Sequence, residues 1–176
     1  TLMYFFNNKY TRSSIQPIGG VMNLSDEDID ENDLYFLIYD WEFYPDVLLE
    51  PSDFSNGRPD RYMEYINIGE RTSMTANSAF GKGTYRLNII LPQKPNSYMI
   101  NLPEIFNAYN LYINNDLMLK MGDIDTGKSG VQERAAMFYG GGRIQVLIAV
   151  NCTDHYYSGM VYPPSFGTPF STNIYR

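Results

Sequence analysis

The stretch Arg143-Ile144-Gln145-Val146-Leu147-Ile148-Ala149-Val150 decides the fold, because its side chains alternate in character along the chain. The apolar set occupies every second position: Ile144, Val146, Ile148 and Val150. The opposite set includes the polar residues Arg143 and Gln145. A period of two is typical of a β-strand with one face in a core and the other face wetter. The stretch therefore predicts a long strand of an antiparallel sheet.

Two further segments alternate in the same way. In 84–91, the polar residues Thr84, Arg86 and Asn88 stand opposite the apolar set Tyr85, Leu87, Ile89 and Leu91. In 107–114, a common face is formed by Tyr109, Leu111 and Ile113. Asn114-Asn115 follows, and because asparagine tolerates positive φ, this pair predicts a tight hairpin turn into 116–121. Weaker patterns predict strands within 34–44, 62–68, 98–102 and 137–139.

Signals for helix are few, and nothing divides the chain into parts. Ser25, followed by three acids, has the pattern of an N-cap, so one short helical turn is predicted over 24–28. Residues 1–176 are expected to form a single all-β domain with little helix, a two-sheet antiparallel sandwich. Strand spacing leaves an immunoglobulin sandwich and a jelly roll open. No cysteine pair flanks Trp41, which disfavours the antibody type, and Trp41 is expected in the core.

Composition excludes several classes of function. The 176 residues carry 13 Lys and Arg against 20 Asp and Glu, a net charge of −7, which argues against nucleic acid or an anionic membrane surface as the main partner. No apolar run reaches the roughly 18 residues of a membrane helix. One Cys and one His exclude an internal disulfide and a Cys/His zinc site. The 16 Tyr and 10 Phe are the marked excess, and exposed aromatic faces suit sugars and peptides.

No complete catalytic constellation is visible in the sequence, so neither catalysis nor a cofactor is expected. Gly81-Lys82-Gly83-Thr84 lacks the spacing of a phosphate-binding loop and more simply opens a strand. Cys152 stands near Asp154 and His155, but it follows an apolar strand and is expected to be a buried thiol. Asp123-Ile124-Asp125-Thr126-Gly127 resembles part of a calcium loop, so calcium binding stays open beside a solvated turn.

The residues expected to meet a ligand are Arg86, Tyr109, Asn151, His155 and Tyr156. Arg86 lies on the polar face of an apolar strand, where its guanidinium suits a structural ion pair or a hydroxylated or anionic ligand. The run 151–159 places hydrogen-bonding groups beside aromatics after the last long strand, where sandwich loops commonly hold ligands or cap their own backbone. Arg86, Asn151 and His155 are expected to make directional hydrogen bonds, and the tyrosine rings to stack on a sugar.

An ordered series of motifs runs along the chain: Gly20-Val21-Met22-Asn23-Leu24-Ser25, Tyr39-Asp40-Trp41-Glu42-Phe43-Tyr44, Leu48-Leu49-Glu50-Pro51-Ser52-Asp53-Phe54, Gly81-Lys82-Gly83-Thr84-Tyr85-Arg86-Leu87, Ile105-Phe106-Asn107-Ala108-Tyr109-Asn110-Leu111-Tyr112-Ile113-Asn114, and the run 151–159. Over residues 20–167, the series resembles the extracellular sensing domain of bacterial DISM receptors, which couple a membrane region to diverse intracellular signalling modules. The resemblance implies a galactose-binding-like jelly roll that binds carbohydrate or another small molecule. It also implies an extracytoplasmic domain at the cell surface of a membrane-anchored protein, with a kinase or diguanylate cyclase module after Arg176.

Three hypotheses of function therefore stand. The favoured one is a non-catalytic, extracytoplasmic ligand sensor of a signalling receptor. The pattern Tyr85-Arg86-Leu87 and the pattern of 108–114 are also similar to jelly rolls attached to β-galactosidases, so the first alternative is a carbohydrate-binding accessory domain of a glycoside hydrolase. The second alternative is a protein-interaction module that uses the aromatic surface to form a homodimer.

Overall fold

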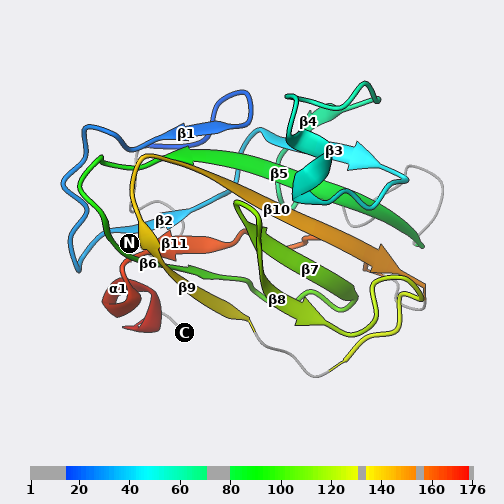
Figure 1. Cartoon of the computed structure of the whole chain (residues 1–176). Helices are drawn as coiled ribbons and strands as arrows, with labels where there is room; N and C mark the ends of the chain where they lie inside the picture. The colour runs from blue at the N-terminus through cyan, green and yellow to red at the C-terminus, as the bar shows by residue number, and fades with distance from the viewer. Residues whose placement is uncertain (1–14, 71–79, 131–133, 154–156, 175–176) are drawn as a thin grey trace, which may run out of the picture.

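Two β-sheets, stacked as layers, form the framework of the molecule (Figure 1). The computed structural model describes residues 15–70, 80–130, 134–153 and 157–174. The larger sheet comprises β1 (Val21–Asn23), β3 (Trp41–Pro45), β4 (Glu64–Ile66), β5 (Gly81–Ile90), β7 (Ala108–Ile113), β8 (Asp116–Met121) and β10 (Arg143–Cys152). The smaller sheet comprises β2 (Leu34–Phe36), β6 (Asn96–Asn101), β9 (Ala135–Gly140) and β11 (Ser165–Gly167). This is the all-β, two-sheet sandwich that the alternating sequence predicted, with the jelly-roll fold that the resemblance implied.

Strand order brings distant segments of the chain together. The larger sheet runs β4-β3-β5-β10-β7-β8, and the smaller runs β2-β11-β6-β9. The named strand pairs are antiparallel except β1, which lies parallel beside β5. The long strands β5 and β10 pair along ten residues, from Arg143 opposite Ile90 to Cys152 opposite Gly81. Because strands that are distant in the sequence are neighbours in the sheet, β3 lies beside Arg86 of β5, and Arg86 in turn contacts Gln145 of β10.

The core lies between the two sheets, and the alternating apolar positions of the strands form it. The four apolar positions of β10 are at most 3% exposed, as are the apolar residues that 84–91 presents to the same side. Trp41 is fully buried there, as expected, and its Nε1–H donates to the Leu37 carbonyl at 2.9 Å. From the smaller sheet, Tyr98 and Phe166 stack with ring centroids 5.4 Å apart. The alternation therefore identifies the side of each long strand that faces the core.

One turn and one strand position show why particular residues are needed where they lie. Asn114 has a φ of 53°, and with Asn115 it forms the two-residue link between β7 and β8, which confirms the predicted hairpin. Gly83 lies in β5, where an added Cβ would come within 2.5 Å of the Phe43 ring. The segment Gly81-Lys82-Gly83-Thr84 thus opens a strand, as predicted, and Gly83 lets an aromatic side chain pack directly on the backbone.

Helix and strand boundaries differ from expectation in three places. The predicted helical turn over 24–28 is wrong: Asn23 Oδ1 accepts from both the backbone N–H and the hydroxyl of Ser25, so the local hydrogen bonds form a turn instead. Helical structure occurs instead in η1 (Pro51–Phe54) and α1 (Pro169–Ile174). The range 34–44 holds two strands, β2 and β3, in different sheets, because the chain turns at Asp40 with a φ of 52°.

A second apolar cluster covers the outer face of the larger sheet, the face turned away from the smaller one. Its buried members are Tyr44, Leu49, Phe54, Tyr112 and Leu147, with Val47 and Met63 packed against them. The segment between β3 and β4, which includes η1, supplies most of this cover. Because it does not extend over the β7–β8 hairpin, an open space remains beside η1.

Candidate functional site

A cleft of about 770 Å³ lies on the outer face of the larger sheet, between η1 and the tip of the β7–β8 hairpin. Its lining combines two aromatic residues, three amides, two serine hydroxyls and one carboxylate, together with a proline: Phe54, Tyr112, Asn114, Asn115, Gln145, Ser52, Ser55, Glu50 and Pro51. Concave sites with a few convergent polar groups beside aromatic rings are the usual form of small-molecule sites. This cleft is the candidate functional site.

The floor of the cleft follows from strand parity. Tyr112 alternates with Leu111 and Ile113, which point into the core, so Tyr112 points outward. Gln145 alternates in the same way with Ile144 and Val146 on β10. Their strands are direct neighbours in the sheet. The two side chains therefore reach the same cleft from adjacent strands.

Gln145 is held in one orientation. Its Oε1 accepts from Arg86 Nε at 2.7 Å. Its backbone N–H donates to Asn114 Oδ1 at 2.9 Å, and its carbonyl accepts from the Asn114 backbone N–H at 2.8 Å. Because the guanidinium occupies the carbonyl end of the side chain, the amide end, with two N–H donors, is the part left to meet a ligand.

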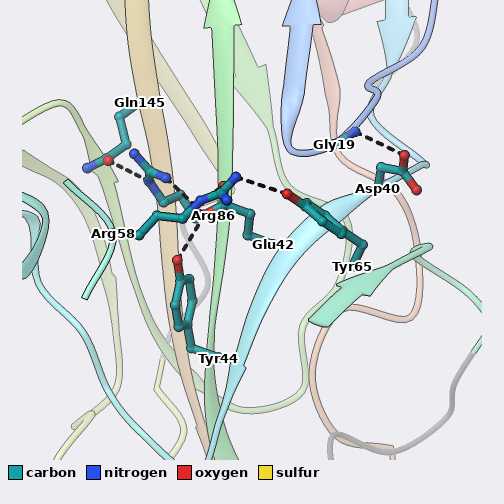
Figure 2. Close-up of polar contacts among 8 residues, drawn as sticks. All are labelled: Gly19, Asp40, Glu42, Tyr44, Arg58, Tyr65, Arg86 and Gln145. Carbon is teal, nitrogen blue, oxygen red and sulfur yellow. Dashed lines mark hydrogen bonds and ion pairs between the residues drawn. The ribbon is translucent and has the colours of Figure 1, made fainter. Parts of the chain in front are cut away.

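Behind Gln145, a buried carboxylate joins two arginines. Glu42 is 1% exposed; its Oε2 lies 2.9 Å from Arg86 Nη1 and its Oε1 lies 2.7 Å from Arg58 Nη2. Figure 2 shows the Arg86 guanidinium bonded to both Gln145 and Glu42. Its carbon lies 4.6 Å from the centroid of the Phe54 ring, which lines the cleft. The ion pairs thus fix a guanidinium directly beneath two cleft residues.

The neighbours of Glu42 respond to its charge. The Tyr44 hydroxyl donates to Glu42 Oε2 at 3.0 Å, and burial, followed by this carboxylate, raises the pKa of Tyr44 above its usual value. The hydrogen bond to Glu42 likewise raises the pKa of Arg58, whose Nη2 also donates to the Tyr65 hydroxyl at 2.9 Å. Both shifts keep protons on the groups that surround the carboxylate.

Among the predicted ligand residues that the structure describes, Arg86 is the one whose side chain contacts the lining of this cleft. It stands opposite Glu42 in the β3–β5 register, so the ion pair arises directly from cross-strand pairing. Its side chain is 13% exposed and touches Phe54 and Gln145, both in the cleft lining. The structural ion pair considered for Arg86 is therefore present. Direct contact between Arg86 and a ligand stays a prediction.

The other predicted residues lie elsewhere. Tyr109 is 1% exposed and faces the core on the opposite side of the sheet, so its ring presents no face to a ligand in the cleft. Asn151 is at the far end of β10, where its Nδ2 donates to the Ile124 carbonyl at 2.8 Å. His155 and Tyr156 lie outside the described residues. The predicted set does not converge on a common site within the part of the chain that the structure describes.

The remaining chemical motifs are accounted for by local bonds. Asp123 Oδ1 accepts from the Asp125 backbone N–H at 3.0 Å, and hydrogen bonds, first that from Thr126, lower the pKa of Asp123. In the described ranges, no three His, Cys, Asp or Glu side chains gather in a metal-binding arrangement. Cys152 is 2% exposed, which confirms its predicted burial, and Asn107 Nδ2 lies 2.9 Å from its sulfur.

No helix among residues 15–70, 80–130, 134–153 and 157–174 is long and apolar enough to cross a membrane.

The predicted ligand set includes none of the residues that line the cleft. Glu50, Ser52 and Ser55 come from the η1 segment, which carries no alternation and was predicted neither as a helix nor as a site. The signal for Tyr112 and Gln145 was present: each is a hydrogen-bonding side chain on the outward parity of a strongly alternating strand. Two such positions on strands that pair are a better marker of a sheet-face site than a polar loop alone.

Comparison with known proteins identifies the fold. No family model and no curated protein matches the sequence. Among solved structures, the chain is similar to a GH2 beta-galacturonidase from Eisenbergiella tayi bound to galacturonate, with a TM-score of 0.56 and 8% identity, covering 81% of this chain and 26% of that one. It is also similar to beta-glucuronidase 2 of Bacteroides uniformis, with a TM-score of 0.54 and 13% identity, covering 76% of this chain and 17% of that one. The beta-glucuronidase of Ruminococcus gnavus gives a TM-score of 0.50 and 14% identity, covering 78% of this chain and 29% of that one. The chain thus spans less than a third of the length of each.

Proposed function

We propose that this chain is a non-catalytic carbohydrate-recognition domain of a larger protein, and that the cleft beside η1 holds the sugar. The observation that carries the proposal is the lining: fixed amide donors, hydroxyls and a carboxylate stand beside the rings of Tyr112 and Phe54. Hydroxyl groups of a sugar need both donors and acceptors, and its C–H faces pack against aromatic rings.

Among the three hypotheses, the accessory domain of a glycoside hydrolase has the most support. The similar solved structures are a beta-galacturonidase and beta-glucuronidases, each several times longer than the matched part. Glycoside hydrolysis generally needs two carboxyl groups about 5 to 10 Å apart. The described lining of the cleft supplies one, that of Glu50. Recognition without bond cleavage is the role that this lining supports best.

The receptor hypothesis uses the same recognition chemistry. An extracytoplasmic sensor of a membrane-anchored receptor would bind a sugar and transmit binding only through different affinities for two receptor states. The sequence encoded beyond residue 176 separates the two: a hydrolase domain favours the accessory role, and a membrane segment with a kinase or cyclase favours the sensor. Light scattering tests the third hypothesis, the protein-interaction module. A concentration-dependent dimer that does not respond to sugars would favour this module over the accessory domain and the sensor.

The expected effect of Gln145→Ala tests the site. Removal of the oriented amide is expected to weaken sugar binding about fivefold to tenfold, as for one or two lost hydrogen bonds. Calorimetric titration with methyl glycosides of neutral hexoses and with uronic acids measures this. Gln93→Ala is the matched control, because Gln93 is an exposed glutamine outside the cleft lining and is expected to leave affinity unchanged. Equal affinities of both variants and the wild type, for a sugar that does bind, would contradict this site.

A further inference from the structure

The charges around the cleft are unevenly distributed. Among the described residues that line it, Glu50 is the only one with a charged side chain at neutral pH. Arg86 is a cation that contacts the lining, through Gln145 and Phe54, and its guanidinium is already paired with the buried carboxylate of Glu42. A ligand in this cleft therefore meets an acid directly and a cation only behind a neutral amide.

Arg58 does not offset the negative charge of Glu50 in the cleft. Its partners are Glu42 on β3 and Tyr65 on β4, whereas the cleft lies over β10, β7 and the turn between β7 and β8. In the strand order, β3 and β4 lie on one side of β5, and β10 and β7 lie on the other. The Arg58 side chain is also 50% exposed, so water and salt screen its charge.

We propose that the cleft selects neutral sugars over uronic acids. This inference rests on the proposed function and names its ligand class. The carboxylate of a uronic acid in the same cleft would face the Glu50 carboxylate with no unpaired cation in the lining to offset the repulsion. A neutral sugar instead offers hydroxyl protons that Glu50 accepts, and hydroxyl oxygens that accept from the amides of Gln145 and Asn115.

Three probes isolate the charge. The methyl β-glycosides of D-galactose, of D-galacturonate and of the C6 methyl ester of D-galacturonate share their ring stereochemistry, and the ester keeps the bulk of the acid without its charge. At pH 7 and low salt, galacturonate is expected to bind at least about fivefold more weakly than the galactoside. The ester is expected to recover most of this loss. At about 0.5 M salt, the difference is expected to shrink, because screening weakens repulsion between exposed charges.

Glu50→Gln is the variant that tests the residue. It removes the charge and keeps the size, and is expected to bring galacturonate within about twofold of the galactoside. Glu104→Gln, at an exposed glutamate outside the cleft lining, controls for net charge and is expected to keep the full difference. Melting curves of both variants check that the fold is intact.

The outcomes separate the two levels of the proposal. Galacturonate binding as tightly as the galactoside, or a difference that persists in Glu50→Gln, would overturn the selectivity and leave carbohydrate recognition standing. Recovery with the ester and with Glu50→Gln, but not with Glu104→Gln, supports it. Failure of all three probes and of other neutral hexosides to bind would overturn the proposed function and this inference together.

Discussion

Glu42→Gln is expected to lower the free energy of unfolding by about 3–5 kcal/mol, the usual cost of removing one partner from a buried ion pair. Glu42 is 1% exposed and accepts from Arg86, Arg58 and Tyr44. Glutamine keeps the shape but not the charge. Arg58 is half exposed and can turn to water, whereas Arg86 lies under Phe54 and would be left with an uncompensated charge.

Urea unfolding followed by circular dichroism measures this loss. Glu31→Gln is the matched control, since Glu31 is exposed, and a change within about 0.5 kcal/mol is expected. Arg86→Ala is expected to cost less than Glu42→Gln, because Glu42 keeps its bond to Arg58. A loss below about 1 kcal/mol for Glu42→Gln would contradict the central place of this carboxylate in the outer face of the sheet.

Trp41→Ala is expected to cost about 3–5 kcal/mol through the cavity it leaves in the core. The indole is fully buried and bonds the Leu37 carbonyl, so the substitution also leaves a buried acceptor unpaired. Trp41→Phe retains most of the apolar packing and is expected to lose clearly less. Both variants lose the hydrogen bond to the Leu37 carbonyl, so the difference between them measures the apolar packing.

Thermal and urea unfolding of these variants are followed by circular dichroism, because Trp41 is the only tryptophan and its fluorescence disappears with it. Tyr62→Ala is the control, at an aromatic residue that is 70% exposed, with an expected change within about 0.5 kcal/mol. A Trp41→Ala protein as stable as the wild type would mean that the two sheets do not pack around this side chain.

The fold was predictable where a strand has one buried face. Ile144, Val146 and Ile148 alternate because each second residue of β10 enters the core, and this period is readable from sequence without knowledge of the partner strands. The helical turn near Ser25 was predicted wrongly because the pattern does not show that Asn23, two residues earlier, captures the same hydrogen bonds. Local competition between capping groups is invisible to a pattern of residue types.

The site was harder to predict because it is assembled from three separated segments. Glu50 directly precedes η1, Tyr112 belongs to β7 and Gln145 to β10, and only the fold brings them together. Arg86 was identified from its polar position in an apolar strand, but its partner Glu42 is 44 residues away in the chain. Parity predicted Tyr109 on the same face as Leu111 and Ile113, and that face is the core. A side chain chosen for its chemistry alone can therefore lie on the wrong side of the sheet.

The most direct test of carbohydrate recognition at the cleft is a titration of the ¹⁵N-labelled protein with methyl β-D-galactopyranoside, followed by NMR. The predicted result is a saturable set of shifts at the backbone amides of Ser52, Ser55 and Asn115 and at the side-chain amide of Gln145. Shifts confined to residues 151–159, or no shifts with this or any other neutral hexoside, would contradict it.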